Sequence, residues 1–157
     1  MTFHDRAIVL QPGEGYSFSL FGDHHSTKAT GQLTEGKLGL VEVQKQAPAA
    51  GPPVHIHHGH DEAFYVLAGE LTVRLGDRTI AAPAGSFVFV PIGTVHGFAN
   101  RGPDEARLLV FSLPAGLERA LEEVSEIAPN ADGPLDMDGL QANARKYRVE
   151  IVGPPLH

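Results

Sequence analysis

Histidine is the residue type that stands out in this chain, since its neutral imidazole is the commonest metal ligand in proteins. The 157 residues contain nine histidines and no cysteine. Any metal must therefore be held by imidazole nitrogens or carboxylate oxygens, and neither a thiolate site nor a thiol nucleophile is available. Six of the histidines fall in two short stretches, at positions 24, 25, 55, 57, 58 and 60.

The pair His55 and His57 has the spacing of a metal half-site on a strand. Side chains two residues apart on a β-strand point to the same face, so both imidazoles can reach a common point while Ile56 faces away. Glu62 opens the next predicted strand, and it lies beside the two histidines if these strands pair through the short turn between them. His96, which follows a later Pro-Ile-Gly turn, offers a fourth donor.

Three imidazoles and one carboxylate suit a divalent transition metal. Fe, Ni, Mn, Co and Cu all accept this donor set, and the sequence does not select among them. In a five- or six-coordinate shell, positions remain for O₂, water or substrate, and Glu62 has a second role open to it as the base for a substrate hydroxyl. Two alternatives stay open: a tetrahedral Zn²⁺ that uses all four ligands in a closed structural site, and a metal-free pocket that merely retains polar residues.

The remaining clustered histidines are expected at the surface. His58 should face away from the ligand pair, and His60 lies in the predicted turn, although an error in register would make it a replacement ligand. Residues 22–30, which carry His24 and His25, are expected to form an exposed loop. The alternative for this loop is a contact at the rim of the pocket or a weak surface metal contact.

Three apolar side chains share a face with the candidate ligands by strand alternation: Phe64, Val66 and Phe98. They either line a substrate pocket or fill the interior, and filling is the more common fate in a small barrel. If they line the pocket, it suits a phenolic or cyclic substrate. No Lys or Arg falls clearly on the ligand face, which weighs modestly against oxalate-type substrates.

The elements that must position these residues are short strands separated by turns. The chain has 18 glycines and 12 prolines, and many of them separate apolar runs at intervals of roughly 8–12 residues. This rhythm predicts an all-β sandwich or antiparallel barrel, without the alternation of strands and helices that a parallel sheet needs. The predicted strands cover residues 16–21, 37–45, 54–57, 62–68, 70–75, 78–82, 86–90, 96–100 and 106–112.

After residue 112 the pattern changes to a helical one. In residues 115–127 apolar positions recur at i, i+4 and i+7, while Glu118 and the other glutamates lie elsewhere on the wheel. A second short helix is predicted over residues 138–147, and a weak strand over residues 148–152. These short C-terminal helices are expected to cover the barrel or form a dimer contact, with a catalytic lid as the alternative.

Two stretches of the sequence resemble the two motifs of the cupin family. The first is carried by Gly51, His55, His57, Glu62 and Gly69, and the second by Gly85, Pro91, Gly93, His96 and Asn100. One departure is that the leading glycine of the first motif is expected six residues before the first histidine, where Ala49 stands. Gly51 comes two places late, which affects the entry turn and not the ligands. The resemblance covers roughly residues 38–112, about half of the chain.

This resemblance implies a jelly-roll barrel with a metal bound inside by His55, His57, Glu62 and His96. A closer likeness, over residues 52–77, 85–100 and 113–118, is to small single-domain cupins related to quercetin 2,3-dioxygenase. It implies a metal-dependent dioxygenase that cleaves a phenolic or enolic substrate, flavonol-like in kind, with O₂ and with Glu62 as base. A redox-neutral isomerase, epimerase, cyclase or decarboxylase, and a non-catalytic small-molecule-binding protein, are the alternatives.

Length and charge set further limits. A chain of 157 residues is predicted to be one domain, residues 1–157, with a barrel core at about 16–112 and a helical segment at about 115–147. The formal charge of −7 gives no electrostatic footprint for nucleic acid or an anionic membrane.

The sequence also gives expectations for the cellular location and the oligomeric state of the protein. No apolar run approaches the roughly 18 residues that span a bilayer, and residues 1–10 lack a signal-peptide pattern, so a cytoplasmic location is expected. The family resemblance also implies a homodimer, for which residues 16–21 are a candidate exchanged strand.

Overall fold

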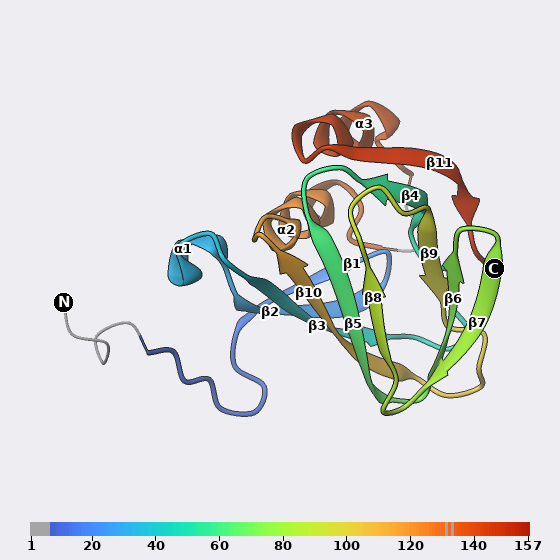
Figure 1. Cartoon of the computed structure of the whole chain (residues 1–157), viewed down its shortest axis with the longest axis horizontal. Helices are drawn as coiled ribbons and strands as arrows, with labels where there is room; N and C mark the ends of the chain where they lie inside the picture. Colours follow the sequence, from blue (N-terminus) through green and yellow to red (C-terminus); the bar gives the residue numbers. More distant parts are fainter. Residues whose placement is uncertain (1–6, 131, 133) are drawn as a thin grey trace.

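Two antiparallel β-sheets face each other in the computed structural model, which describes residues 7–130, 132 and 134–157 (Figure 1). The larger sheet has the strand order β1-β2-β3-β10-β5-β8, and the smaller has the order β11-β4-β9-β6-β7. The fold is an all-β jelly roll with C-terminal helices, which confirms the predicted fold class. Residues 1–6, which belong to the N-terminal stretch predicted to lack a signal peptide, lie outside the described residues.

The bounds of the elements match most of the predicted ranges to within two residues. The larger sheet consists of β1 (Tyr16–Leu20), β2 (Asp23–Ala29), β3 (Gly39–Lys45), β10 (Ala106–Leu113), β5 (Asp61–Ala68) and β8 (Phe87–Val90). The smaller sheet consists of β11 (Val149–Pro155), β4 (Pro53–His57), β9 (His96–Ala99), β6 (Glu70–Leu75) and β7 (Arg78–Pro83). The helices are α1 (Gly31–Thr34), α2 (Leu117–Ile127) and α3 (Met137–Lys146).

Alternating side chains build the core between the sheets. In β5, Phe64 and Val66 point inward and are fully buried, whereas Tyr65 and Leu67 point outward and are each 39% exposed. Leu71 of the facing sheet belongs to the same core cluster. Each such buried side chain contributes about 1.5–3 kcal/mol to the stability of the fold, because its apolar surface is removed from water. The period-two pattern therefore determines which residues of β5 face the interior.

The late glycine of the first motif has a structural reason. A Cβ atom at position 51 would lie 1.5 Å from the carbonyl oxygen of Phe98, so only glycine lets the entry to β4 pass this close to β9. Ala49, which stands at the usual glycine position, forms a two-way backbone bridge with Asn100 that tolerates its methyl group. The shift of the glycine to Gly51 thus leaves the strand that follows in place.

Residues 22–30 do not form the exposed loop that was predicted. They contain strand β2, which pairs with β1 on one side and with β3 on the other. His25 and Thr27 point inward and are buried, while His24 points outward and is exposed. A seven-residue strand of mostly polar residues lacks the apolar alternation by which strands are recognised, and this explains why the prediction was wrong.

Strand β11 also departs from prediction, because it continues through Pro154 and Pro155 instead of ending at residue 152. Proline cannot donate a backbone hydrogen bond, but it is tolerated on an edge strand. β11 is such an edge strand, and its only neighbour in the sheet of described residues is β4. The C-terminal segment therefore covers the outer edge of the strand that carries His55 and His57.

Helix α2 packs across β1 and β3, and α3 lies over β11 and against α2 (Figure 1). Leu117 is buried, and Leu121 packs on the core as the helical periodicity predicts. Glu118, in contrast, was predicted on the outer part of the wheel, yet it is only 1% exposed. Its carboxylate accepts hydrogen bonds from the backbone N–H groups of Gly31 at 2.9 Å and of Gly116 at 2.8 Å, which compensates for its burial.

Of the described helices, none has the length and apolar character of a membrane-spanning segment.

Candidate metal centre

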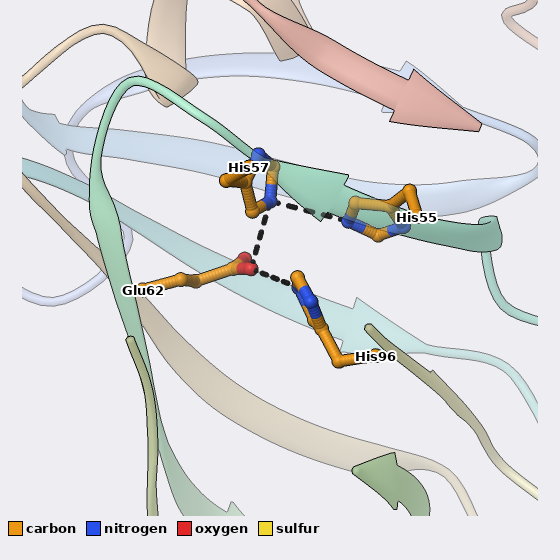
Figure 2. A group of neighbouring side chains, drawn as sticks. All are labelled: His55, His57, Glu62 and His96. Carbon is orange, nitrogen blue, oxygen red and sulfur yellow. Dashed lines mark hydrogen bonds and ion pairs between the residues drawn. The ribbon is translucent and has the colours of Figure 1, made fainter. Parts of the chain in front are cut away.

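Four side chains from three strands converge between the two sheets (Figure 2). β4 carries His55 and His57, β5 of the facing sheet carries Glu62, and β9 carries His96. One ligand atom from each residue lies within 4.8 Å of the others. The register places His55 directly opposite His96 on the neighbouring strand, which explains why two residues distant in sequence meet here.

The donor atoms face one another at short range. Nε2 of His55 lies 3.1 Å from Nε2 of His57, which in turn lies 3.0 Å from Oε2 of Glu62. Nε2 of His96 lies 2.7 Å from the same carboxylate oxygen. Two nitrogens bound at about 2.1 Å and at right angles around one ion are about 3 Å apart, so these spacings suit neighbouring ligands of a single cation. All four side chains are buried.

Hydrogen bonds on the far side of two rings indicate which nitrogens carry lone pairs. Nδ1 of His55 lies 2.6 Å from the carbonyl oxygen of Pro53, and Nδ1 of His96 lies 2.9 Å from that of Thr94. A carbonyl only accepts, so both Nδ1 atoms donate, and Nε2 of a neutral ring is then an acceptor. For His96 this acceptor faces a carboxylate, so a proton or a cation has to lie between the two atoms. The donor set therefore fits a bound metal ion.

The pKa shifts within the cluster also fit a bound metal ion. Burial raises the pKa of Glu62, but the charges and hydrogen bonds of His57 and His96 outweigh it and hold that pKa well below the ordinary value. Burial lowers the pKa of His96, yet the hydrogen bond and charge of Glu62 outweigh it and raise the pKa. Burial lowers the pKa of His55 to about 4, so this ligand is neutral near pH 7. Near neutral pH the cluster thus offers an ionised carboxylate and a neutral His55, and a metal ion that binds takes the place of the proton that His96 shares with Glu62.

The three apolar residues predicted beside the ligands all lie in or against the core. Phe64 and Val66 are fully buried, and Phe98 is partly buried with its ring centroid 5.3 Å from that of Phe64. Their role as walls of a substrate pocket stays a prediction.

A lysine also lies inside the barrel, which sequence reasoning missed. Nζ of Lys45 is 2.6 Å from a carboxylate oxygen of Asp23 and 5.8 Å from the centre of the Phe98 ring. Its charge is balanced by Asp23, and both residues are buried. Asp23 belongs to β2, so its position beside Lys45 became visible only with the pairing of β2 and β3.

The other clustered histidines separate into exposed and buried ones. His58 is exposed, as predicted, and lies 2.7 Å from a carboxylate oxygen of Glu150. His60 was predicted at the surface, and this prediction was wrong. The residue is only 5% exposed, and its ring centroid is 4.2 Å from that of His57. The turn between β4 and β5 thus holds His60 in the interior, and burial lowers the pKa of His60 to about 4.

His25 is the second histidine that the prediction placed wrongly at the surface. Its ring stacks on Phe18 with the centroids 5.2 Å apart, and burial lowers the pKa of His25 to about 4. It is not among the residues whose donor atoms form the four-residue group.

Known proteins resemble this chain over the barrel. Residues 39–112, which contain all four converging side chains, match the family model described as Cupin domain. The chain is 35% identical over 92 residues to quercetin 2,3-dioxygenase of Bacillus subtilis (strain 168), a match that covers 57% of this chain and 26% of that protein. It is 31% identical over 103 residues to polyketide synthase CurC of Streptomyces cyaneus, covering 66% of this chain and 65% of that protein. It is 32% identical over 108 residues to protein SchB of Streptomyces halstedii, covering 66% of this chain and 76% of that protein.

Among solved structures, an RmlC-like cupin from Shewanella frigidimarina NCIMB 400 superposes with a TM-score of 0.59 at 23% identity, covering 68% of this chain and 89% of the other. At that identity the likeness bears on the fold alone. The present chain spans about a quarter of the length of the quercetin 2,3-dioxygenase and just under two thirds of that of CurC.

Proposed function

Because this chain belongs to the cupin family, we propose that it is a metal-dependent dioxygenase of the quercetin 2,3-dioxygenase-like type. Its substrate would be a small phenolic or enolic molecule, cleaved at a C–C bond with O₂. The observation that carries the proposal is the convergence of three imidazoles and one carboxylate on one buried point. The similarity to a quercetin 2,3-dioxygenase over 57% of the chain supports it.

The side chains have distinct roles in this proposal. His55, His57, Glu62 and His96 hold a divalent ion, which we propose to be Fe, Ni, Mn, Co or Cu, with Zn as the alternative. When bound, such an ion would supply Lewis acidity and a route for charge from the substrate to O₂. Glu62, which is ionised within the buried cluster, would accept the proton of the substrate hydroxyl at a carboxylate oxygen. Phe64, Val66 and Phe98 exclude water and position the ring.

Elemental analysis followed by O₂ uptake tests the proposal. Untagged protein purified without added metals is first analysed for bound ions. O₂ consumption is then measured with the Fe-, Ni- and Cu-loaded protein over a panel of flavonols and catechols. We expect uptake with at least one substrate, and none in the His96→Ala variant. Complete lack of uptake by protein with verified metal would show that the dioxygenase proposal is wrong.

A redox-neutral reaction at the same centre is the second candidate, favoured by the 31% identity to a protein named as a polyketide synthase. Such a reaction would be an isomerisation, epimerisation, cyclisation or decarboxylation, and it would run without O₂. Substrate conversion in an anaerobic chamber therefore distinguishes the two candidates.

We also propose that residues 1–157 act as a single cupin domain and that the protein forms a homodimer, with residues 16–21, which include β1, as the candidate exchanged strand.

A further inference from the structure

His60 is buried without a hydrogen bond to its Nε2 atom from any described residue. An imidazole has two nitrogens that hydrogen-bond in every tautomer, and buried polar atoms in native proteins almost always have a partner. A histidine in such a place therefore points to a partner outside the polypeptide, which is water or a ligand.

A second unpartnered nitrogen lies on the adjacent ring. Nδ1 of His57 is buried and has no partner among the described residues, whereas Nδ1 of His55 and of His96 each donate to a backbone carbonyl. The ring centroids of His57 and His60 are 4.2 Å apart, and the two ring planes form an angle of 38°. Within the described part of the chain, three buried side-chain atoms lack a partner, and two of them are on these neighbouring rings.

We propose that His60 is the positioning residue for His57. A shared polar bridge, one water molecule in the simplest case, joins Nδ1 of His57 to His60 and orients the ring so that its Nε2 atom faces the metal. Metal-binding histidines usually donate their second N–H to such a partner, and loss of the partner typically weakens metal binding about 10–100-fold. The inference rests on the metal centre of the proposed function and not on the reaction catalysed there.

His60 is not a fifth ligand in this arrangement. The group of donor atoms that lie within 4.8 Å of one another contains His55, His57, Glu62 and His96, and it does not include His60. Its place in the turn between β4 and β5, with its ring centroid 4.2 Å from that of His57, is that of a partner to a ligand.

The test uses Co²⁺ binding to the metal-stripped full-length protein. The dissociation constant is measured by competition with a chelator, and the visible absorption of bound Co²⁺ reports the ligand geometry. His60→Phe keeps an aromatic ring of similar size but removes both nitrogens, while His60→Asn keeps a donor and an acceptor. His58→Ala is the matched control, since His58 is two residues away but exposed and bonded to Glu150.

We expect His60→Phe to weaken Co²⁺ binding about 10–100-fold and to shift the absorption bands. His60→Asn should recover part of the affinity, and His58→Ala should bind as the wild type does. A packing role predicts that Phe is the better substitute, so wild-type affinity in His60→Phe would overturn the proposal. Equal weakening by Phe and Asn would also overturn it, because the donor and acceptor of Asn would then make no difference. A wild-type protein that takes up no Co²⁺ would overturn both this inference and the metal centre. Tight binding without O₂ uptake would refute only the dioxygenase.

Discussion

At the scale of single residues, the centre depends on groups that are unfavourable to bury separately and compatible together. Glu62 is an ionised carboxylate with two histidines in contact, and a proton or a metal ion between its oxygen and Nε2 of His96 makes that contact favourable. Removing one partner of such a buried set leaves the others without compensation. The ligands should therefore be far more sensitive to substitution than the charged residues on the surface.

Substitution of Glu62 by Gln tests this sensitivity. The amide has nearly the same shape but no charge, so it neither balances the metal ion nor acts as a base. We expect Glu62→Gln to weaken metal binding by at least about 100-fold, beyond what is typical for residues outside the ligand set. Metal content after dialysis measures the effect, and Glu150→Gln, at an exposed carboxylate, serves as control. Equal metal content in the two variants would contradict the assignment of Glu62.

At the scale of elements, the segments that pack around the barrel place further ionisable groups out of solvent. β2 carries His25 against Phe18, with Asp23 and Lys45 nearby, and His24 on the outward face of the strand. The pKa of His25 falls from 6.5 to about 4 on folding because burial disfavours the charged ring. Below pH 6.5 the unfolded chain therefore binds more protons than the folded one, and stability falls as the pH is lowered towards 4.

The His25→Gln variant should reveal this dependence. From the two pKa values, His25 makes the wild type lose about 2 kcal/mol of unfolding free energy between pH 7 and pH 5. The variant lacks this contribution, so its loss over the same interval should be smaller by about that amount. Urea denaturation of the metal-free proteins at both pH values provides the measurement, and parallel curves for the two proteins would speak against a buried neutral His25.

Helix α2 depends on the buried carboxylate of Glu118. Glu118→Ala would leave the N–H groups of Gly31 and Gly116 without their acceptor, and we expect a loss of about 3 kcal/mol of unfolding free energy. Glu126→Ala on the same helix is the control, because Glu126 is exposed and its loss should change stability by less than about 0.5 kcal/mol. Urea melts of both variants decide the matter, and similar midpoints would mean that Glu118 is not structurally important.

The sequence allowed the ligand strands to be predicted because their signals are local. Alternation in β5 and the His55-Ile56-His57 spacing determine which side chains share a face. Pairing of the strands then brings the ligand side chains together. His60, His25 and Glu118 were misplaced because their burial depends on what a turn, a neighbouring strand or an approaching backbone does in three dimensions. Polar residues carry no hydropathy signal for such burial, so only the assembled fold shows it.

At the scale of the whole molecule, the centre connects the two sheets. Its donors come from β4 and β9 of the smaller sheet and from β5 of the larger one. An ion bound there joins segments that are separate in the unfolded chain, so its binding free energy adds to the stability of the fold.

Metal should therefore raise the melting temperature. At a free concentration of about 100 times the dissociation constant, the added stability is about 2.7 kcal/mol. For a chain of this size this corresponds to a rise of roughly 5–10 °C. Scanning calorimetry with and without Co²⁺ measures the shift, and the His96→Ala variant should show almost none. An unchanged wild-type melting temperature at saturating metal would argue against a centre that links the sheets.

The pairing of β11 with β4 also bears on how the protein is made. β4 leaves the ribosome early, whereas β11 emerges on the order of ten seconds later at typical bacterial elongation rates of about 5–20 residues per second. During that interval the strand bearing His55 and His57 has an open edge, where a second nascent chain can pair with it. Pairing with β11 therefore closes an edge of β4 at which copies of the chain could otherwise associate.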